Sequence, residues 1–187
     1  MLDPMTALIV VDLQTGVVGP PLVRPIGEVV ARIRALADAF RQRDLSAALV
    51  DVDGGAPGRT EQPRQTAPLA EGRADLIPEL NRQPDDIVVT KRTRGAFAGA
   101  DLEAQLKARG VTQAAVAGGG AATGAESTAR QANEHGFNVT LAVDAMADRR
   151  LEARDCSVTQ AFPRLGETGT TKRIIDRLAG MVFGTAR

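Results

Sequence analysis

Short apolar runs alternate along the chain with longer segments in which hydrophobic residues recur every three or four positions. The runs are rich in Val, Ile and Ala and carry few polar residues, which is typical of strands buried on both faces of a parallel sheet. They occupy residues 7–11, 45–52, 87–90, 114–117 and 138–143, and the polar residues 166–171 add a short sixth strand. We therefore expect six strands.

The periodic segments predict helices between and after these strands. They cover residues 26–43, 101–109, 125–130, 151–162 and 171–178, with Asp101 as N-cap, Gly110 as a stop and Pro163 as the end of the fourth helix. Alternation of strands and helices favours a doubly wound α/β fold. The expected architecture is a mostly parallel six-stranded sheet with helices on both faces, in a single domain over residues 1–187.

Two segments interrupt this alternation and read as loops near a functional site. Residues 15–25 contain two glycines and three prolines, and residues 59–84 are polar and broken by four prolines, with a helical hint only around residues 74–80. A long excursion within a compact domain is usually a lid, a substrate-facing loop or a subunit contact. We expect it to carry specificity.

The charge composition of the chain limits the classes of binding partner. The 23 basic and 23 acidic residues cancel, so no global field favours nucleic acid or an anionic membrane, and a small metabolite fits better. No apolar run approaches the roughly 18 residues of a membrane span. The N-terminus carries Asp3, unlike the basic start of a secretory signal, and the single Cys156 cannot form an internal disulfide. These features predict a cytoplasmic protein.

Chemistry-bearing residues follow three of the predicted strands. Asp12 follows the first strand, Lys91 follows the third, and the glycines of residues 118–120 follow the fourth. In an open parallel sheet these carboxyl ends form a ligand crevice, in which backbone amides can bind an anionic group. The alternatives are structural: Asp12 caps a local turn with Gln14, Lys91 is an exposed strand-end residue, and the glycines make a tight turn.

Four stretches in this order resemble the isochorismatase-like hydrolase superfamily over nearly the whole chain: VVDLQ at 10–14, TKRTRGAF at 90–97, VAGGGAATGAESTAR at 116–130 and VDAMAD at 143–148. The resemblance implies a catalytic set at Asp12, Lys91 and position 124. In the cysteine-hydrolase branch position 124 holds the nucleophile, whereas this chain has Gly124, which cannot attack.

The same resemblance implies a non-proline cis peptide at Gly119–Gly120 or Gly120–Ala121, which would orient the amides of Ala121 and Gly124 toward an anion. It also implies a substrate site that includes Gln14, Arg94, Phe97, Gly119, Gly120 and Ala121. Arg94 could bind a substrate carboxylate bidentately. Phe97 is expected on the pocket wall, with core packing as the alternative, and Asp144 is expected to secure the loop beside the site.

Asp51 and Asp53 close the second strand and could hold a hard cation, although turn capping is the favoured interpretation. The nicotinamidase branch binds metal through an Asp-x-His pair there. This chain has only His135, in a downstream helix, so we expect no metal and no cofactor.

True isochorismatases also lack the cysteine, and there an Asp protonates the vinyl ether of the substrate before water attacks. Ala121 and Gly124 match that branch, whereas Ala122 replaces its His. The resemblance therefore implies non-covalent hydrolysis of a small metabolite with a vinyl ether or related bond. The alternative is a catalytically silent member that binds a ligand or acts through oligomer contacts. Family members are commonly homodimers or larger homo-oligomers, and we expect the same here.

Overall fold

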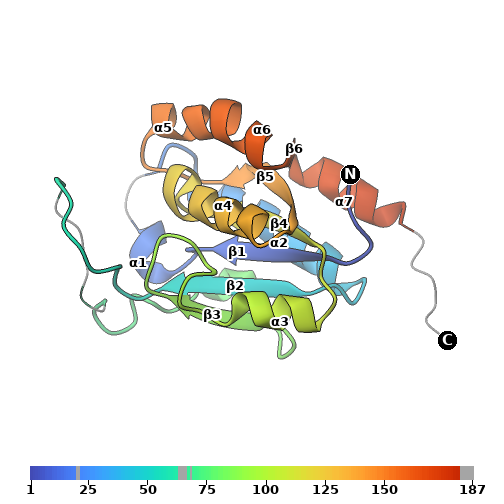
Figure 1. Cartoon of the computed structure of the whole chain (residues 1–187), viewed down its shortest axis with the longest axis horizontal. Helices are drawn as coiled ribbons and strands as arrows, with labels where there is room; N and C mark the ends of the chain where they lie inside the picture. Colours follow the sequence, from blue (N-terminus) through green and yellow to red (C-terminus); the bar gives the residue numbers. More distant parts are fainter. Residues whose placement is uncertain (20–21, 63–66, 68, 182–187) are drawn as a thin grey trace.

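The computed structural model describes residues 1–19, 22–62, 67 and 69–181, in which six strands form one sheet (Figure 1). The strand order is β3-β2-β1-β4-β5-β6 and every pairing is parallel. The strands are β1 (Thr6–Val11), β2 (Ala47–Val52), β3 (Ile87–Lys91), β4 (Gln113–Gly118), β5 (Asn138–Met146) and β6 (Glu167–Gly169). The predicted six-stranded α/β fold is confirmed.

Helices cover both faces of the sheet, and each face has its own hydrophobic core. Helices α3 (Leu102–Ala108), α4 (Glu126–Glu134) and α6 (Phe162–Leu165) pack on one face, while α2 (Ile26–Arg41) and α7 (Thr171–Ala179) pack on the other. Figure 1 shows α4 crossing in front of the sheet and α2 behind it. Burial on both faces explains why all six residues of β1 are buried.

The strand order places a crevice between β1 and β4. The chain winds from β1 outward to β2 and β3, and then returns to pair β4 with the other side of β1. At such a reversal, the connections leaving the two central strands diverge to opposite faces and open a space at their carboxyl ends. Val11 and Gly118 are register partners there, so Asp12 and the glycine-rich turn start side by side.

Several element boundaries differ from the sequence prediction. Residues 15–25 were expected to be a loop, but the short helix α1 spans Thr15–Val18. Strand β5 continues past residue 143 to Met146, through an irregular pairing with β4. Asp101 occupies the N-cap position of α3, yet its side chain makes no capping hydrogen bond.

The predicted helix at residues 151–162 is continuous but changes winding. Helix α5 (Leu151–Cys156) passes through a π-helical segment, η3 (Ser157–Ala161), into α6. Pro163 was expected to stop the helix, but it lies inside α6, directly after the π-helical segment, and the helix continues to Leu165. The chain leaves the helix three residues later, at Gly166.

The excursion between β2 and β3 is mostly irregular where it is described, with one 3-10 turn, η1 (Pro78–Leu80). Its second half is tied to the segment after Asp12: Thr15 N donates to Asp75 O at 3.0 Å, and Ile77 N donates to Leu13 O at 3.1 Å. Pro63 and Pro68, two of its predicted breakers, lie outside the described residues. Nowhere in the described chain is a helix both long and apolar enough to cross a membrane.

Candidate active site

Asp12 and Lys91 form a buried ion pair at the carboxyl end of the sheet. The Lys91 Nζ lies 3.0 Å from Asp12 Oδ1 and 3.2 Å from Oδ2. Asp12 is the first residue after β1 and adopts a left-handed backbone with φ of 58°, while Lys91 ends β3. Because β2 separates these strands, the lysine side chain reaches across the end of β2. The structure thus brings together the two residues that the sequence predicted.

The Lys91 ammonium is fully engaged. Besides the Asp12 carboxylate, Nζ donates to the carbonyl oxygens of Thr93 at 3.2 Å and Arg94 at 2.9 Å. An ammonium has three N–H donors, so all three are accounted for, and its side chain is only 2% exposed. Lys91 is therefore a fixed positive charge beside Asp12, and the alternative of an exposed strand-end lysine is wrong.

Burial raises the pKa of Asp12 above its ordinary value, because desolvation disfavours the carboxylate. The charge and hydrogen bond of Lys91 oppose this shift, whereas the nearby Asp51 carboxyl adds to it. Oδ1 accepts no hydrogen bond from the described residues, although it lies 3.0 Å from the ammonium nitrogen. A buried carboxyl with a raised pKa suits proton transfer.

The glycine-rich turn after β4 packs directly on Asp12. Gly118 and Gly120 both have positive φ, 127° and 61°, and a Cβ at Gly118 would overlap the Val11 carbonyl oxygen. The predicted cis peptide at Gly119–Gly120 or Gly120–Ala121 is wrong, since every peptide bond in the described residues is trans. The left-handed glycines redirect the chain instead, into the π-helical segment η2 (Ala121–Ala125).

Gly124 leaves space that the Asp12 carboxylate occupies. A Cβ built at Gly124 would overlap Asp12 Oδ2 and lie 3.3 Å from its Cγ. Asp12 is in turn held by Lys91, so a side chain at position 124 would have to displace an ion-paired carboxylate. The Asp12 carboxylate thus occupies the position that the Cβ of any other residue at 124 would take.

The amide of Ala121 is not available to an anion. Its N–H donates to Ala147 O at 3.0 Å, and the next amide, of Ala122, donates to Asp148 Oδ2 at 2.8 Å. The expected anion-donor role of Ala121 is therefore wrong, because its N–H is hydrogen-bonded to the loop after β5. Gly119 N likewise donates to Val11 O at 2.8 Å.

Two adjoining cavities open at Asp12. One of about 540 Å³ and one of about 220 Å³ share Asp12, Arg94 and Thr123. The larger is also lined by Val17, Leu22, Gln62, Gly120, Ala122, Asp148, Arg149, Arg150 and Ala153, and the smaller by Val52, Gly54, Gly55, Ala56, Lys91, Thr93 and Gly124. This size suits a small metabolite. Arg94, predicted to contact substrate, lies on the wall of both.

Two other predicted substrate residues do not reach these cavities. Gln14 is fully buried, where its amide accepts from Val52 N at 2.7 Å and donates to Val52 O at 2.8 Å, joining β1 to β2. Phe97 is 5% exposed and stacks near His135 and Phe137, with ring centroids 5.4 and 5.8 Å away. Core packing, the alternative for Phe97, is confirmed.

Asp148, which the sequence prediction did not single out, secures the site. Its carboxylate accepts from the amides of Ala122 at 2.8 Å, Arg149 at 2.7 Å and Arg150 at 3.2 Å. Asp144 had been given this role, but its Oδ1 instead accepts from Thr171 N at 2.7 Å. The signal available in the sequence was the position of Asp148, an acid between the fifth strand and the helix predicted at residues 151–162. Acids at such positions commonly cap the start of a helix.

The two acids that close β2 divide in their roles. Asp53 Oδ1 accepts from Leu69 N at 2.7 Å, a contact with the excursion after β2 and not with its own turn, so turn capping stays a prediction for that residue. Burial raises the pKa of Asp51, opposed by a hydrogen bond with Thr90. Among the described residues, no group of three or more His, Cys, Asp or Glu side chains is placed to hold a metal ion.

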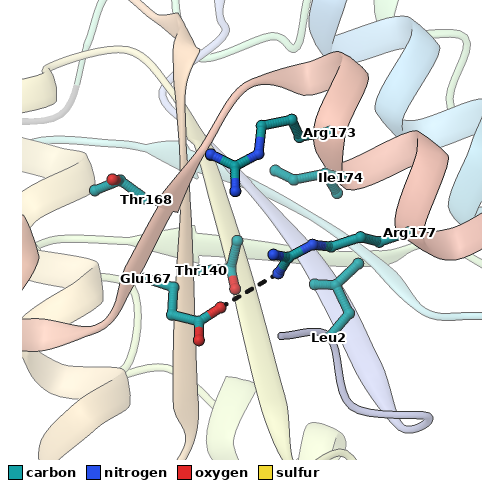
Figure 2. A pocket seen from close by; sticks show the side chains of 8 residues that line it. Leu2, Thr140, Glu167, Thr168, Arg173, Ile174 and Arg177 are labelled. Carbon is teal, nitrogen blue, oxygen red and sulfur yellow. Dashed lines mark hydrogen bonds and ion pairs between the residues drawn. The ribbon is translucent and has the colours of Figure 1, made fainter.

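A further cavity, of about 330 Å³, lies by the β6 edge and the start of the chain, between β6 and α7 (Figure 2). Arg173 and Arg177 extend into it from α7, and Glu167 of β6 pairs with Arg177 at 3.4 Å. It is also lined by Leu2, which precedes β1, and by Thr140 in the first half of β5, so it lies away from the carboxyl ends where Asp12 and Lys91 meet.

Comparisons with known proteins agree with this architecture. The isochorismatase domain family matches residues 6–173. The isochorismatase family protein YwoC of Bacillus subtilis is 33% identical over 180 residues, covering 92% of this chain and 94% of its own. The streptothricin hydrolase of Streptomyces noursei is 37% identical over 143 residues, covering 75% of this chain and 49% of its own. The structure of an isochorismatase family protein from Burkholderia thailandensis superposes with a TM-score of 0.91 at 37% identity, covering 95% of this chain and 97% of that one. The chain belongs to the isochorismatase family of hydrolases.

Proposed function

We propose that the chain hydrolyses a small metabolite at a vinyl ether or related bond, by non-covalent acid–base chemistry centred on Asp12 and Lys91. The observation that carries the proposal is the buried Asp12–Lys91 pair, which opens into two cavities of metabolite size. Asp12 itself lines both cavities, which places the paired carboxyl beside a bound substrate.

The cavity walls support a mechanism without a cysteine or histidine. No described residue that lines either cavity is of these types. Cys156 is exposed on α5 and lines neither cavity, so a covalent thiol intermediate has no nucleophile here. At position 124 the volume is already taken by the Asp12 carboxylate.

The proposed reaction uses the raised pKa of Asp12. The protonated carboxyl transfers its proton to the vinyl carbon of the substrate, and the carboxylate that remains is stabilised by the Lys91 ammonium. The cation formed on the substrate then lies beside a carboxylate, which favours it electrostatically. A water molecule adds to this cation and returns a proton to Asp12, and the resulting hemiketal breaks down to a ketone and an alcohol.

Arg94 supports substrate capture. It is exposed, lines both cavities, and its guanidinium has no acidic partner among the described residues. Its carbonyl is fixed by Lys91 Nζ at 2.9 Å, which couples the position of Arg94 to the catalytic pair. A substrate carboxylate bound by this arginine would place the rest of the molecule next to Asp12.

A catalytically silent ligand-binding protein is the second candidate function. It is favoured by the lack of functional side chains at Gly95, Ala121, Ala122 and Gly124. At Gly95 a Cβ would overlap the Gln131 amide, which accepts from Phe97 N at 3.0 Å, so this region is closed by packing rather than left open for chemistry. The homo-oligomeric state, the absence of a cofactor and the cytoplasmic location stay predictions.

The test is a hydrolysis screen of isochorismate, related enol ethers and small amides, with the wild type beside Asp12→Asn. Turnover of an enol ether that disappears in the variant supports the proposal. Turnover confined to amides would contradict the proposed bond type. No turnover, together with ligand binding that survives the substitution, would support the silent alternative.

A further inference from the structure

Three arginines surround the larger cavity from two different loops. Arg94 follows β3, whereas Arg149 and Arg150 follow β5. All three are exposed, and none of their guanidinium groups has an acidic partner among residues 1–19, 22–62, 67 and 69–181. Among the described residues, six other arginines form ion pairs with acids, as Arg32, Arg41 and Arg130 do. The three guanidinium groups at this cavity have no such pair and lie on its wall.

The arginines after β5 are held in place by their backbone. Asp148 accepts the amides of Arg149 at 2.7 Å and Arg150 at 3.2 Å, and its other oxygen accepts Ala122 N at 2.8 Å from the turn beside Asp12. Asp148 is buried, so one carboxylate links the two arginines to the turn that packs on Asp12. The two side chains thus start from fixed positions on the cavity wall.

The charge balance of the cavity indicates its ligand. Three arginines and two aspartates, Asp12 and Asp148, line it, which leaves a net positive charge in a chain whose total charge is zero. Protonation of Asp12, which its burial favours, makes the cavity more positive still. A wall with this balance attracts anions, and guanidinium groups bind planar carboxylates bidentately.

We infer that Arg149 and Arg150 determine specificity by binding a carboxylate of the substrate, on the wall contributed by the loop after β5. This rests on the proposed function only in taking the larger cavity as the substrate site. A substrate that reaches both loops presents one end to Arg149 and Arg150 and the other to Arg94, with the bond to be cleaved over Asp12.

The experiment measures binding, so it does not depend on turnover. Benzoate and glutarate are titrated by calorimetry against wild type and against the double variant Arg149→Gln/Arg150→Gln, with benzamide, glutaramide and inorganic phosphate as comparison ligands. The control is Arg164→Gln/Arg173→Gln, which removes the same charge from exposed α6 and from the separate cavity of Figure 2. Each titration is repeated in the Asp12→Asn background.

We expect the wild type and the control to bind a carboxylate at least about tenfold more tightly than its amide, and the Arg149/Arg150 variant to lose that preference, because hydrogen bonds between charged groups are stronger than those between neutral groups. The inference would be overturned if the Arg149/Arg150 variant kept the preference for carboxylate over amide, or if the control lost it. It would also be overturned if the wild type bound phosphate more tightly than carboxylate, or showed no saturable binding of carboxylate. If the wild type turns over no substrate while the preference is retained in the wild type and in the Asp12→Asn background, the inference stands and the hydrolase proposal fails.

Discussion

Gly124 and Asp12 share one volume: a methyl group on Gly124 would overlap the Oδ2 of the Asp12 carboxylate. Because Lys91 also binds that carboxylate, Asp12 has little freedom to move away. The glycine is therefore part of the geometry of the acid–base pair.

Gly124→Ala should disturb Asp12, since overpacking a tight site costs about 1–3 kcal/mol and a displacement of roughly 1 Å can lower a rate about a hundredfold. We expect hydrolysis to fall by at least about tenfold, and Gly124→Cys to gain no thiol-dependent activity. Gly27→Ala is the control, because a Cβ there in α2 meets nothing within 4 Å. Assays of rate and thermal stability decide this, and a Gly124→Ala enzyme with wild-type rate would contradict it.

The Asp12–Lys91 pair should show strong coupling in stability. Removing one partner of a buried ion pair costs about 3–5 kcal/mol, because the other charge is left uncompensated. We expect Asp12→Asn and Lys91→Met each to lose stability on this scale in urea unfolding at neutral pH. The double variant should lose clearly less than the sum of the two. Additive losses would show that the two groups do not interact as the 3.0 Å contact implies.

Hydrolysis should fall as the pH rises through the raised pKa of Asp12. The proton that Asp12 donates is bound more tightly than by an ordinary aspartic acid, because burial disfavours the carboxylate. Below this pKa the acid form is present and the rate should level off, whereas above it the rate should drop with a slope of about one decade per pH unit. The measurement is kcat/KM against pH. A rate that increases over the same range would assign Asp12 the role of a base.

Asp148→Ala should loosen the turn that packs on Asp12. The substitution leaves the amides of Ala122, Arg149 and Arg150 without their acceptor, and a buried donor without a partner costs about 1–3 kcal/mol. We expect lower thermal stability and a raised KM, with partial rescue in Asp148→Asn, which keeps an acceptor oxygen. Asp176→Ala, which removes an exposed pair with Lys172, is the control. Equal effects of Asp148→Ala and this control would contradict the role of Asp148 in holding the turn beside Asp12.

The sheet and the Asp12–Lys91 pair could be predicted because they depend on regular features. Buried strands have a distinctive composition, and the carboxyl ends of parallel strands converge wherever the helices lie. Asp12 and Lys91 each directly follow an apolar run, so the fold alone brings them together. The family resemblance then singled out these two residues from other strand-end charges.

The misplaced residues depend on irregular backbone that no periodicity reveals. Asp12 has a positive φ, which breaks the alternation of side chains and turns Gln14 into the interior, toward Val52. Phe97 lies in a loop whose amide is bound by Gln131 of α4, a contact between distant parts of the chain. Asp148 was missed because β5 runs to Met146, beyond its predicted end, so the acid that caps the following turn is Asp148 rather than Asp144.

The most direct test of the account is the hydrolysis rate of wild type, Asp12→Asn, Lys91→Ala and Cys156→Ser on one substrate under the same conditions. We predict that the first two substitutions each lower the rate by about a hundredfold or more, the scale of lost acid–base catalysis, and that Cys156→Ser leaves it unchanged. Full activity in Asp12→Asn, or loss of activity in Cys156→Ser, would contradict a cysteine-independent mechanism based on Asp12 and Lys91.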